Sequence, residues 1–184
     1  DGFGTYAVAF ATDALANGPS GGWVNLDVQP TQGPCWYGDT WLDGRSEGRR
    51  HEGVDIFTVP GQYVYAVVDG RLSSRIWDQP TLRSGNALWL TAADGSATFF
   101  YAHLLDVAPG LRAGSRVRAG QIIGFVGDTG NAAAVHLHFE IHPATMRGLG
   151  YDGVVAPYPI LIAWRRAEDI AFAAGRIYVP VGPG

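Results

Sequence analysis

Residues 136–143 read HLHFEIHP, and they contain three of the five histidines in the chain. In a β-strand successive side chains point to opposite faces, so this stretch would divide its residues into two sets. One face would carry His136, His138, Glu140 and His142, and the other would carry Leu137, Phe139 and Ile141. The second face is typical of a core. Two imidazoles side by side on the first face favour a metal site or a proton-transfer site over an ordinary solvated surface.

The composition favours one globular domain made mainly of β-strands. The chain has 184 residues, of which 47% are hydrophobic and 16% charged, enough to bury one core. The 26 glycines and 11 prolines, with eight Tyr, eight Phe and six Trp, indicate short strands joined by many turns. We therefore expect residues 1–184 to form a single, mainly β domain.

The charge pattern excludes some partners. The formal net charge is −4, and all 13 basic residues are arginine, so the basic excess that nucleic acids require is missing.

No apolar run approaches the roughly 20 residues of a membrane span. No signal peptide is recognised at the start of the sequence.

Strand-like segments become clear from Val54 onward, because β-branched and aromatic residues recur between turn residues. Asp69-Gly70 and Asp94-Gly95 are typical of tight hairpin turns, so we expect antiparallel neighbours on both sides of each. Residues 160–175, ILIAWRRAEDIAFAAG, predict one helix that ends at Gly175.

A second histidine-bearing segment, HEGVDI, places His51 and Asp55 four positions apart. In a fully extended strand their Cα atoms would lie about 13 Å apart, which is long for two ligands of one ion, but Gly53 would let the chain bend. Imidazole and carboxylate ligands with one open position are the recurrent layout of hydrolytic zinc sites. His51, Asp55 and one member of the His136/His138 pair would supply it. The helical H-E-x-x-H motif is missing, because Asp55 stands where its second histidine would be.

Five stretches in order resemble the lysostaphin-type zinc endopeptidases, which cut peptidoglycan cross-bridges: HEGVDI, VYAVVDGRL, FFYAHL, GQIIGFVGDTG and HLHFEI. The resemblance covers roughly residues 48–143. Residues 1–47 form an extension without a clear counterpart, and residues 144–184 form a C-terminal segment that includes the expected helix.

The resemblance implies a zinc metalloendopeptidase that uses one zinc ion. Its ligands would be His51, Asp55 and His138, and its catalytic residues would be His103 and His136. One catalytic histidine would orient or deprotonate the attacking water and the other would stabilise the oxyanion, without a fixed assignment of the two roles. The implied fold is an antiparallel β-sheet with an open groove and a short C-terminal helix. The implied substrate is peptidoglycan peptide, in an extracellular, periplasmic or cell-wall-facing location.

Neighbouring polar residues have less defined roles. Glu140 could orient a metal ligand or form an ordinary salt bridge with an arginine. His142 is interpreted as a peripheral polar residue. Asp128 and Thr129 are expected to fix a turn.

Two alternative functions remain open from the sequence. One is a non-catalytic scaffold or activator of another cell-wall hydrolase with the same fold, which would require the groove to be blocked by residues 1–47. The other is a cysteine peptidase that uses Cys35 with His136. The loop-like GPCWYG segment around Cys35 offers no helix N-terminus to lower the thiol pKa, so a small buried hydrophobe is the favoured interpretation of this residue.

Overall fold

The computed structural model describes residues 23–24, 28–76, 82–149, 153–165, 170–173 and 176–178. Over these residues the fold is mostly antiparallel β-sheet with one short helix, α2 (Pro157–Arg165), so the predicted fold class is confirmed. Two 3-10 turns, η1 (Ser46–Gly48) and η2 (Ala144–Met146), also occur. Among the described residues, no helix combines the length and the apolar character that a membrane crossing requires.

The strands form a small sheet and a large one, with all pairings antiparallel. The small sheet contains β1 (Trp23–Val24), β10 (Ile170–Ala173) and β11 (Arg176–Tyr178). The large sheet contains β2 (Val54–Phe57), β3 (Tyr63–Tyr65), β4 (Gly70–Ile76), β5 (Asn86–Ala92), β6 (Ala97–Val107), β7 (Arg116–Val117), β8 (Ile122–Val126) and β9 (His136–Pro143).

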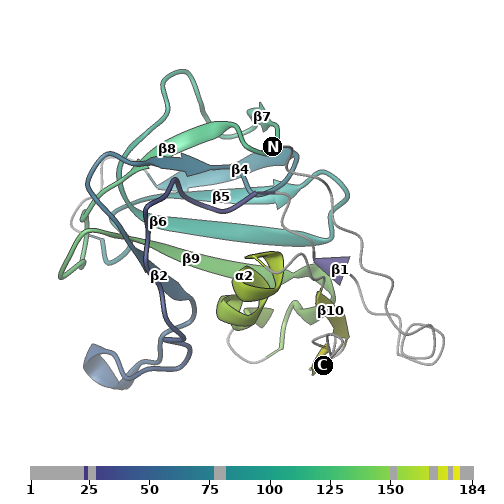
Figure 1. Cartoon of the computed structure of the whole chain (residues 1–184). Helices are drawn as coiled ribbons and strands as arrows, with labels where there is room; N and C mark the ends of the chain where they lie inside the picture. The colour runs from purple at the N-terminus through teal and green to yellow at the C-terminus, as the bar shows by residue number, and fades with distance from the viewer. Residues whose placement is uncertain are drawn as a thin grey trace.

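The large sheet follows the order β2-β9-β6-β5-β4-β7, and β8 joins β6 to β3 (Figure 1). β6 is the longest strand and changes partner along its length. Residues 97–102 of β6 pair with β9, and residues 104–107 pair with β8. The helix α2 contacts β9. The change from β9 to β8 as the partner of β6 therefore falls at His103, which pairs with neither strand in this register.

The alternation expected for residues 136–143 is confirmed. Leu137, Phe139 and Ile141 are fully buried in the main core, where Phe139 lies against Phe99 and Tyr101. The opposite face of β9 is turned away from this core. Burial of every second side chain fixes the strand in register, because a slip of one residue would move the whole apolar set to the other face.

The two Asp-Gly predictions have different outcomes. β5 and β6 pair around Asp94-Gly95, and Gly95 has φ 74°, so that hairpin is confirmed. The prediction at Asp69-Gly70 is wrong, because β3 pairs with β8 while β4 pairs with β5 and β7. A Cβ at Gly70 would lie 2.3 Å from the Thr91 carbonyl oxygen. Glycine here permits close approach of two strands and does not form a hairpin turn.

The predicted helix over 160–175 is only partly correct. α2 begins at Pro157, where a proline costs no hydrogen bond, and it ends at Arg165. Residues 170–173 form β10 and pair with β1 and β11, so the second half of the prediction is wrong. In β10 the backbone N–H and C=O groups form hydrogen bonds with β1 and β11, so this segment does not need a helix to satisfy them. Gly175 lies outside the described residues.

Tyr101 provides a test of the core. It is fully buried, and its hydroxyl accepts a hydrogen bond from the Val67 N–H at 3.2 Å. In Tyr101→Phe this buried N–H loses its acceptor, so we expect the free energy of unfolding in urea to fall by about 1–3 kcal/mol. Tyr63→Phe is the control, because Tyr63 is 40% exposed, and it should change stability by less than about 0.5 kcal/mol. Equal stability of Tyr101→Phe and the wild type would contradict this account.

Candidate metal centre

The register of β2 against β9 sets the centre, because it places Asp55 directly opposite His138. His51 lies before β2 and reaches the same point through a bend at Gly53. A Cβ at Gly53 would lie 2.7 Å from Cε1 of His138, so only glycine allows the chain to pass against this ring. The bend brings His51 Nε2 to 3.0 Å from Asp55 Oδ1.

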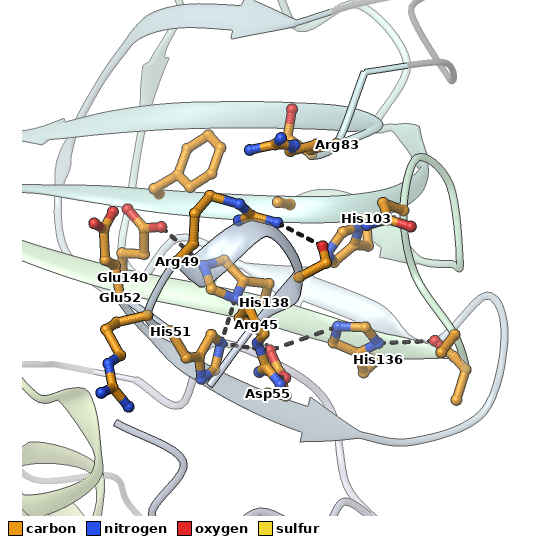
Figure 2. Close-up of a pocket in the computed structure, with 18 of the residues that line it drawn as sticks. Arg45, Arg49, His51, Glu52, Asp55, Arg83, His103, His136, His138 and Glu140 are labelled. Carbon is orange, nitrogen blue, oxygen red and sulfur yellow. Dashed lines mark hydrogen bonds and ion pairs between the residues drawn. The ribbon is translucent and has the colours of Figure 1, made fainter. Parts of the chain in front are cut away.

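Three potential ligand atoms converge at this point (Figure 2). His51 Nε2 and His138 Nδ1 lie 2.9 Å apart, and each lies 3.0 Å from Asp55 Oδ1. The outer ring nitrogens are used elsewhere: His51 Nδ1 donates to the Thr40 carbonyl and His138 Nε2 donates to Glu140 Oε1, both at 2.8 Å. When both rings are neutral, the inner atoms direct lone pairs at one another, and a positive charge at this point, a proton on His138 or a metal ion, relieves the repulsion. This donor set fits a zinc ion with one position left open.

The charges around the centre support this interpretation. Burial raises the pKa of Asp55, but contacts with His138 and His51 outweigh burial and hold that pKa well below its usual range. Arg45 Nη2 donates to the other carboxylate oxygen, Oδ2, at 2.6 Å, which leaves Oδ1 for a metal. Burial lowers the pKa of His138, but Asp55 and Glu140 raise it to about 9. The pocket thus attracts a positive charge to His138, and a bound metal would displace the proton.

Glu140 holds the outer side of His138. Its two oxygens accept hydrogen bonds from His138 Nε2 and His142 Nε2, both at 2.8 Å. Burial raises the pKa of Glu140, but the two imidazoles outweigh this and lower it to about 2. Between the two roles open to Glu140, the geometry therefore favours orientation of His138. His142, interpreted from the sequence as a peripheral polar residue, contacts the carboxylate that holds this ring.

His103 reaches the groove through an unusual backbone conformation. It has φ 62°, in the left-handed region that residues other than glycine rarely adopt. In a regular strand its side chain would share the core-facing side with Tyr101. The left-handed turn instead directs the imidazole into the groove, at a cost of about 1–3 kcal/mol. Its Nδ1 donates to the Thr129 carbonyl at 2.8 Å, and the Thr129 hydroxyl donates to the Leu104 carbonyl at 2.7 Å.

His136 lies beside His103 on the open side of the centre. The two ring centroids are 4.7 Å apart, and His136 Nε2 lies 3.5 Å from Asp55 Oδ1. His136 Nδ1 donates to the Ala134 carbonyl at 2.8 Å. Burial lowers the pKa of His136 and lowers the pKa of His103 to about 4. Both rings are therefore neutral at pH 7, with Nδ1 carrying the proton and Nε2 presenting a lone pair.

One open groove has a volume of about 560 Å³, and its lining includes Arg45, His51, Asp55, His103, His136, His138 and Glu140. The structure thus brings the five histidine and aspartate residues predicted from the sequence to one place (Figure 2). Cys35, the nucleophile of the alternative hypothesis, is half-buried and packs against the main core. The sequence did not reveal Arg45 or the carbonyl of Thr40, and it gave Thr129 only a turn role although its carbonyl holds the His103 ring. They act through loop contacts that have no local sequence signal.

Comparisons with known proteins give a consistent result. The family profile described as Peptidase family M23 matches residues 49–148. The glycyl-glycine endopeptidase ALE-1 of Staphylococcus capitis is 40% identical over 93 residues, which is 50% of this chain and 25% of that protein. The L-Ala--D-Glu endopeptidase of Bacillus subtilis is 34% identical over 143 residues, which is 72% of this chain and 41% of that protein. The chain therefore spans less than half the length of either relative.

A solved structure is also similar. The catalytic domain of lysostaphin from Staphylococcus simulans matches with a TM-score of 0.59 at 30% identity, over 69% of this chain and 92% of that domain. The match therefore covers nearly all of the solved lysostaphin domain.

Gly53 tests whether close packing sets the position of His138. In Gly53→Ala the new methyl group would displace the His138 ring, so we expect the affinity for Zn²⁺ to fall about 10-fold or more in competition with a chromophoric chelator. Gly44→Ala is the matched control, because a Cβ at Gly44 meets nothing within 4 Å. Wild-type zinc affinity in Gly53→Ala would show that the ring does not depend on this contact.

The hydrogen bonds of Glu140 lead to a second prediction about zinc affinity. Glu140→Ala frees the outer nitrogen of His138, and we expect zinc affinity to fall by about 10- to 100-fold. His142→Ala should have a smaller effect in the same direction, because it removes only one support of the carboxylate. Both variants should keep the wild-type circular dichroism spectrum. If zinc affinity is unchanged in Glu140→Ala, the carboxylate does not hold the ring.

Proposed function

The chain belongs to peptidase family M23, and on this premise we propose that it is a zinc-dependent endopeptidase that hydrolyses peptide bonds in bacterial peptidoglycan. The predicted resemblance to lysostaphin-type peptidases is confirmed by the relatives and by the structural match. The observation that carries the proposal is the convergence of His51, Asp55 and His138 beside two neutral histidines in an open groove.

In this proposal His51, Asp55 and His138 hold one zinc ion. When bound, zinc would supply Lewis acidity, which makes water a better nucleophile at neutral pH and polarises a carbonyl. The protein supplies the orientation of the ligands, through the Thr40 carbonyl behind His51 and Glu140 behind His138. Arg45 binds Oδ2 of the Asp55 carboxylate, which leaves Oδ1 available to the metal.

The two remaining histidines perform the proton transfers. Each presents an Nε2 lone pair to the groove, because its Nδ1 hydrogen is held by a backbone carbonyl. Either ring can therefore accept a proton from the attacking water. The resulting imidazolium can stabilise the negative oxygen of the tetrahedral intermediate and return the proton to the leaving amine. Fixed tautomers and burial keep both rings neutral at pH 7, with Nε2 able to accept a proton.

A peptidoglycan substrate implies a location that faces the cell wall, in the periplasm or outside the cell. The alternative of a non-catalytic scaffold requires a blocked groove. The described part of the N-terminal extension, residues 23–24 and 28–47, leaves the groove open. Each of the five described site positions carries a residue that can bind metal or transfer a proton, which favours the enzyme.

Removal of the proton-transfer groups should separate catalysis from metal binding. We expect His103→Ala and His136→Ala each to lower the rate of peptidoglycan hydrolysis by about 10²- to 10⁴-fold, while both variants still bind one zinc ion. His138→Ala should lose both properties, and a chelator should abolish wild-type activity until zinc is restored. New amino termini in digested peptidoglycan, identified by mass spectrometry, measure the reaction.

Two results would contradict the proposal. One is the absence of any new amino terminus with the zinc-loaded wild type. The other is full activity in His138→Ala. Cys35→Ser is the control for the cysteine-peptidase alternative and should retain activity.

A further inference from the structure

One wall of the groove is rich in arginine. Three arginines come from the segment that leads to His51, and a fourth stands before β5: Arg45, Arg49, Arg50 and Arg83. Cations around a metal centre repel the metal, so their presence calls for an explanation. Their partners show which of them are already neutralised within the described part of the chain.

Three of the four arginines have defined partners. Arg45 pairs with Asp55. Arg83 pairs with Glu47, and both side chains of this pair are exposed. Arg50 is exposed, and its Nη1 donates to a backbone carbonyl at 3.3 Å. None of these three guanidinium groups needs a ligand to satisfy it.

Arg49 is different. It is half-buried, and its Nη2 makes only a long contact of 3.4 Å with Ser46 Oγ. Its Nε is shielded from solvent and has no hydrogen-bond partner, and no carboxylate pairs with it among the residues that the structure describes. Figure 2 shows the Arg49 side chain extending over the groove that His103 and His138 also line. A buried donor without a partner is costly, so this guanidinium is prepared for an anion that the chain itself does not supply.

The acidic residues of the groove do not fill this role. Glu140 is held by His138 and His142. Glu52 is exposed, and among the described residues no ion pair joins it to Arg49. The anion for Arg49 must therefore come with the substrate. A carboxylate is the natural partner, because the planar guanidinium fork binds it through two parallel hydrogen bonds.

We propose that Arg49 binds a free carboxylate of the substrate next to the scissile bond. The preferred substrates are then stem peptides that carry a free side-chain carboxylate, such as that of glutamate, and not uncharged glycine bridges. This inference rests on the proposed peptidase function and selects among its substrates. Arg49 is a specificity-determining residue in this role, and it takes no part in the transfer of protons.

The test uses two synthetic peptides that differ in one group. One carries the carboxylate beside the scissile bond, and the other carries a carboxamide of the same shape at that position. We expect the zinc-loaded wild type to cleave the acid with a kcat/KM at least about 10-fold higher than the amide. The acid-to-amide ratio should fall to about 1 in Arg49→Gln and to an intermediate value in Arg49→Lys. Arg112→Gln, a change outside the groove, should keep the wild-type ratio.

The outcomes separate this inference from the proposed function. Equal cleavage of acid and amide by the wild type, faster cleavage of a pentaglycine peptide, or an unchanged ratio in Arg49→Gln would overturn the role of Arg49 while leaving the peptidase intact. If neither peptide is cleaved, calorimetry with the zinc-loaded His103→Ala variant decides. A Kd at least about 10-fold lower for the acid would support the carboxylate site although the enzymatic proposal fails, and equal Kd values would reject both.

Discussion

The mutual repulsion of three lone pairs is the constraint on which the site depends. His51 Nε2, Asp55 Oδ1 and His138 Nδ1 lie within 3.0 Å of one another, and no proton of their own separates them when both rings are neutral. A positive charge at the centre relieves this repulsion, either the proton that His138 binds or a metal ion that displaces it, and the surrounding protein must prevent the groups from turning away. The Thr40 carbonyl holds the outer nitrogen of His51, and Glu140 holds that of His138. The register of β2 on β9 keeps Asp55 opposite His138.

The same groove maintains opposite charge states a few ångströms apart. Asp55 remains ionised because the imidazoles of His138 and His51 hold its pKa low, whereas His103 and His136 remain neutral because burial outweighs their favourable contacts. Divergent pKa values among adjacent titratable groups are a common property of catalytic sites. In the proposed function, they separate the side that would bind the metal from the side that would transfer protons.

Several important contacts come from the segment before residue 49, where the match to the family begins. This segment supplies the Thr40 carbonyl behind His51 and the Arg45 side chain on Asp55. Arg49, at the first matched residue, supplies the unpaired guanidinium over the groove. The residues of the centre thus come from the matched core, and the contacts behind His51 and Asp55 come from the loop that precedes it.

The sequence alone determined the parts of this protein that follow a regular period. Alternation along residues 136–143 predicted one core face and one chemical face, and the order of the histidine motifs predicted which residues would meet. Only the tertiary structure decided the rest, because long-range contacts overrode local preference. His103 reaches the groove through a left-handed φ at the point where β6 changes partner, and strand periodicity would have placed it in the core. Gly70 serves close strand packing instead of a turn, residues 170–173 pair as a strand where a helix was expected, and Arg45 finds Asp55 across a loop. Each of these outcomes depends on partners distant in the chain, and a local pattern carries no information about them.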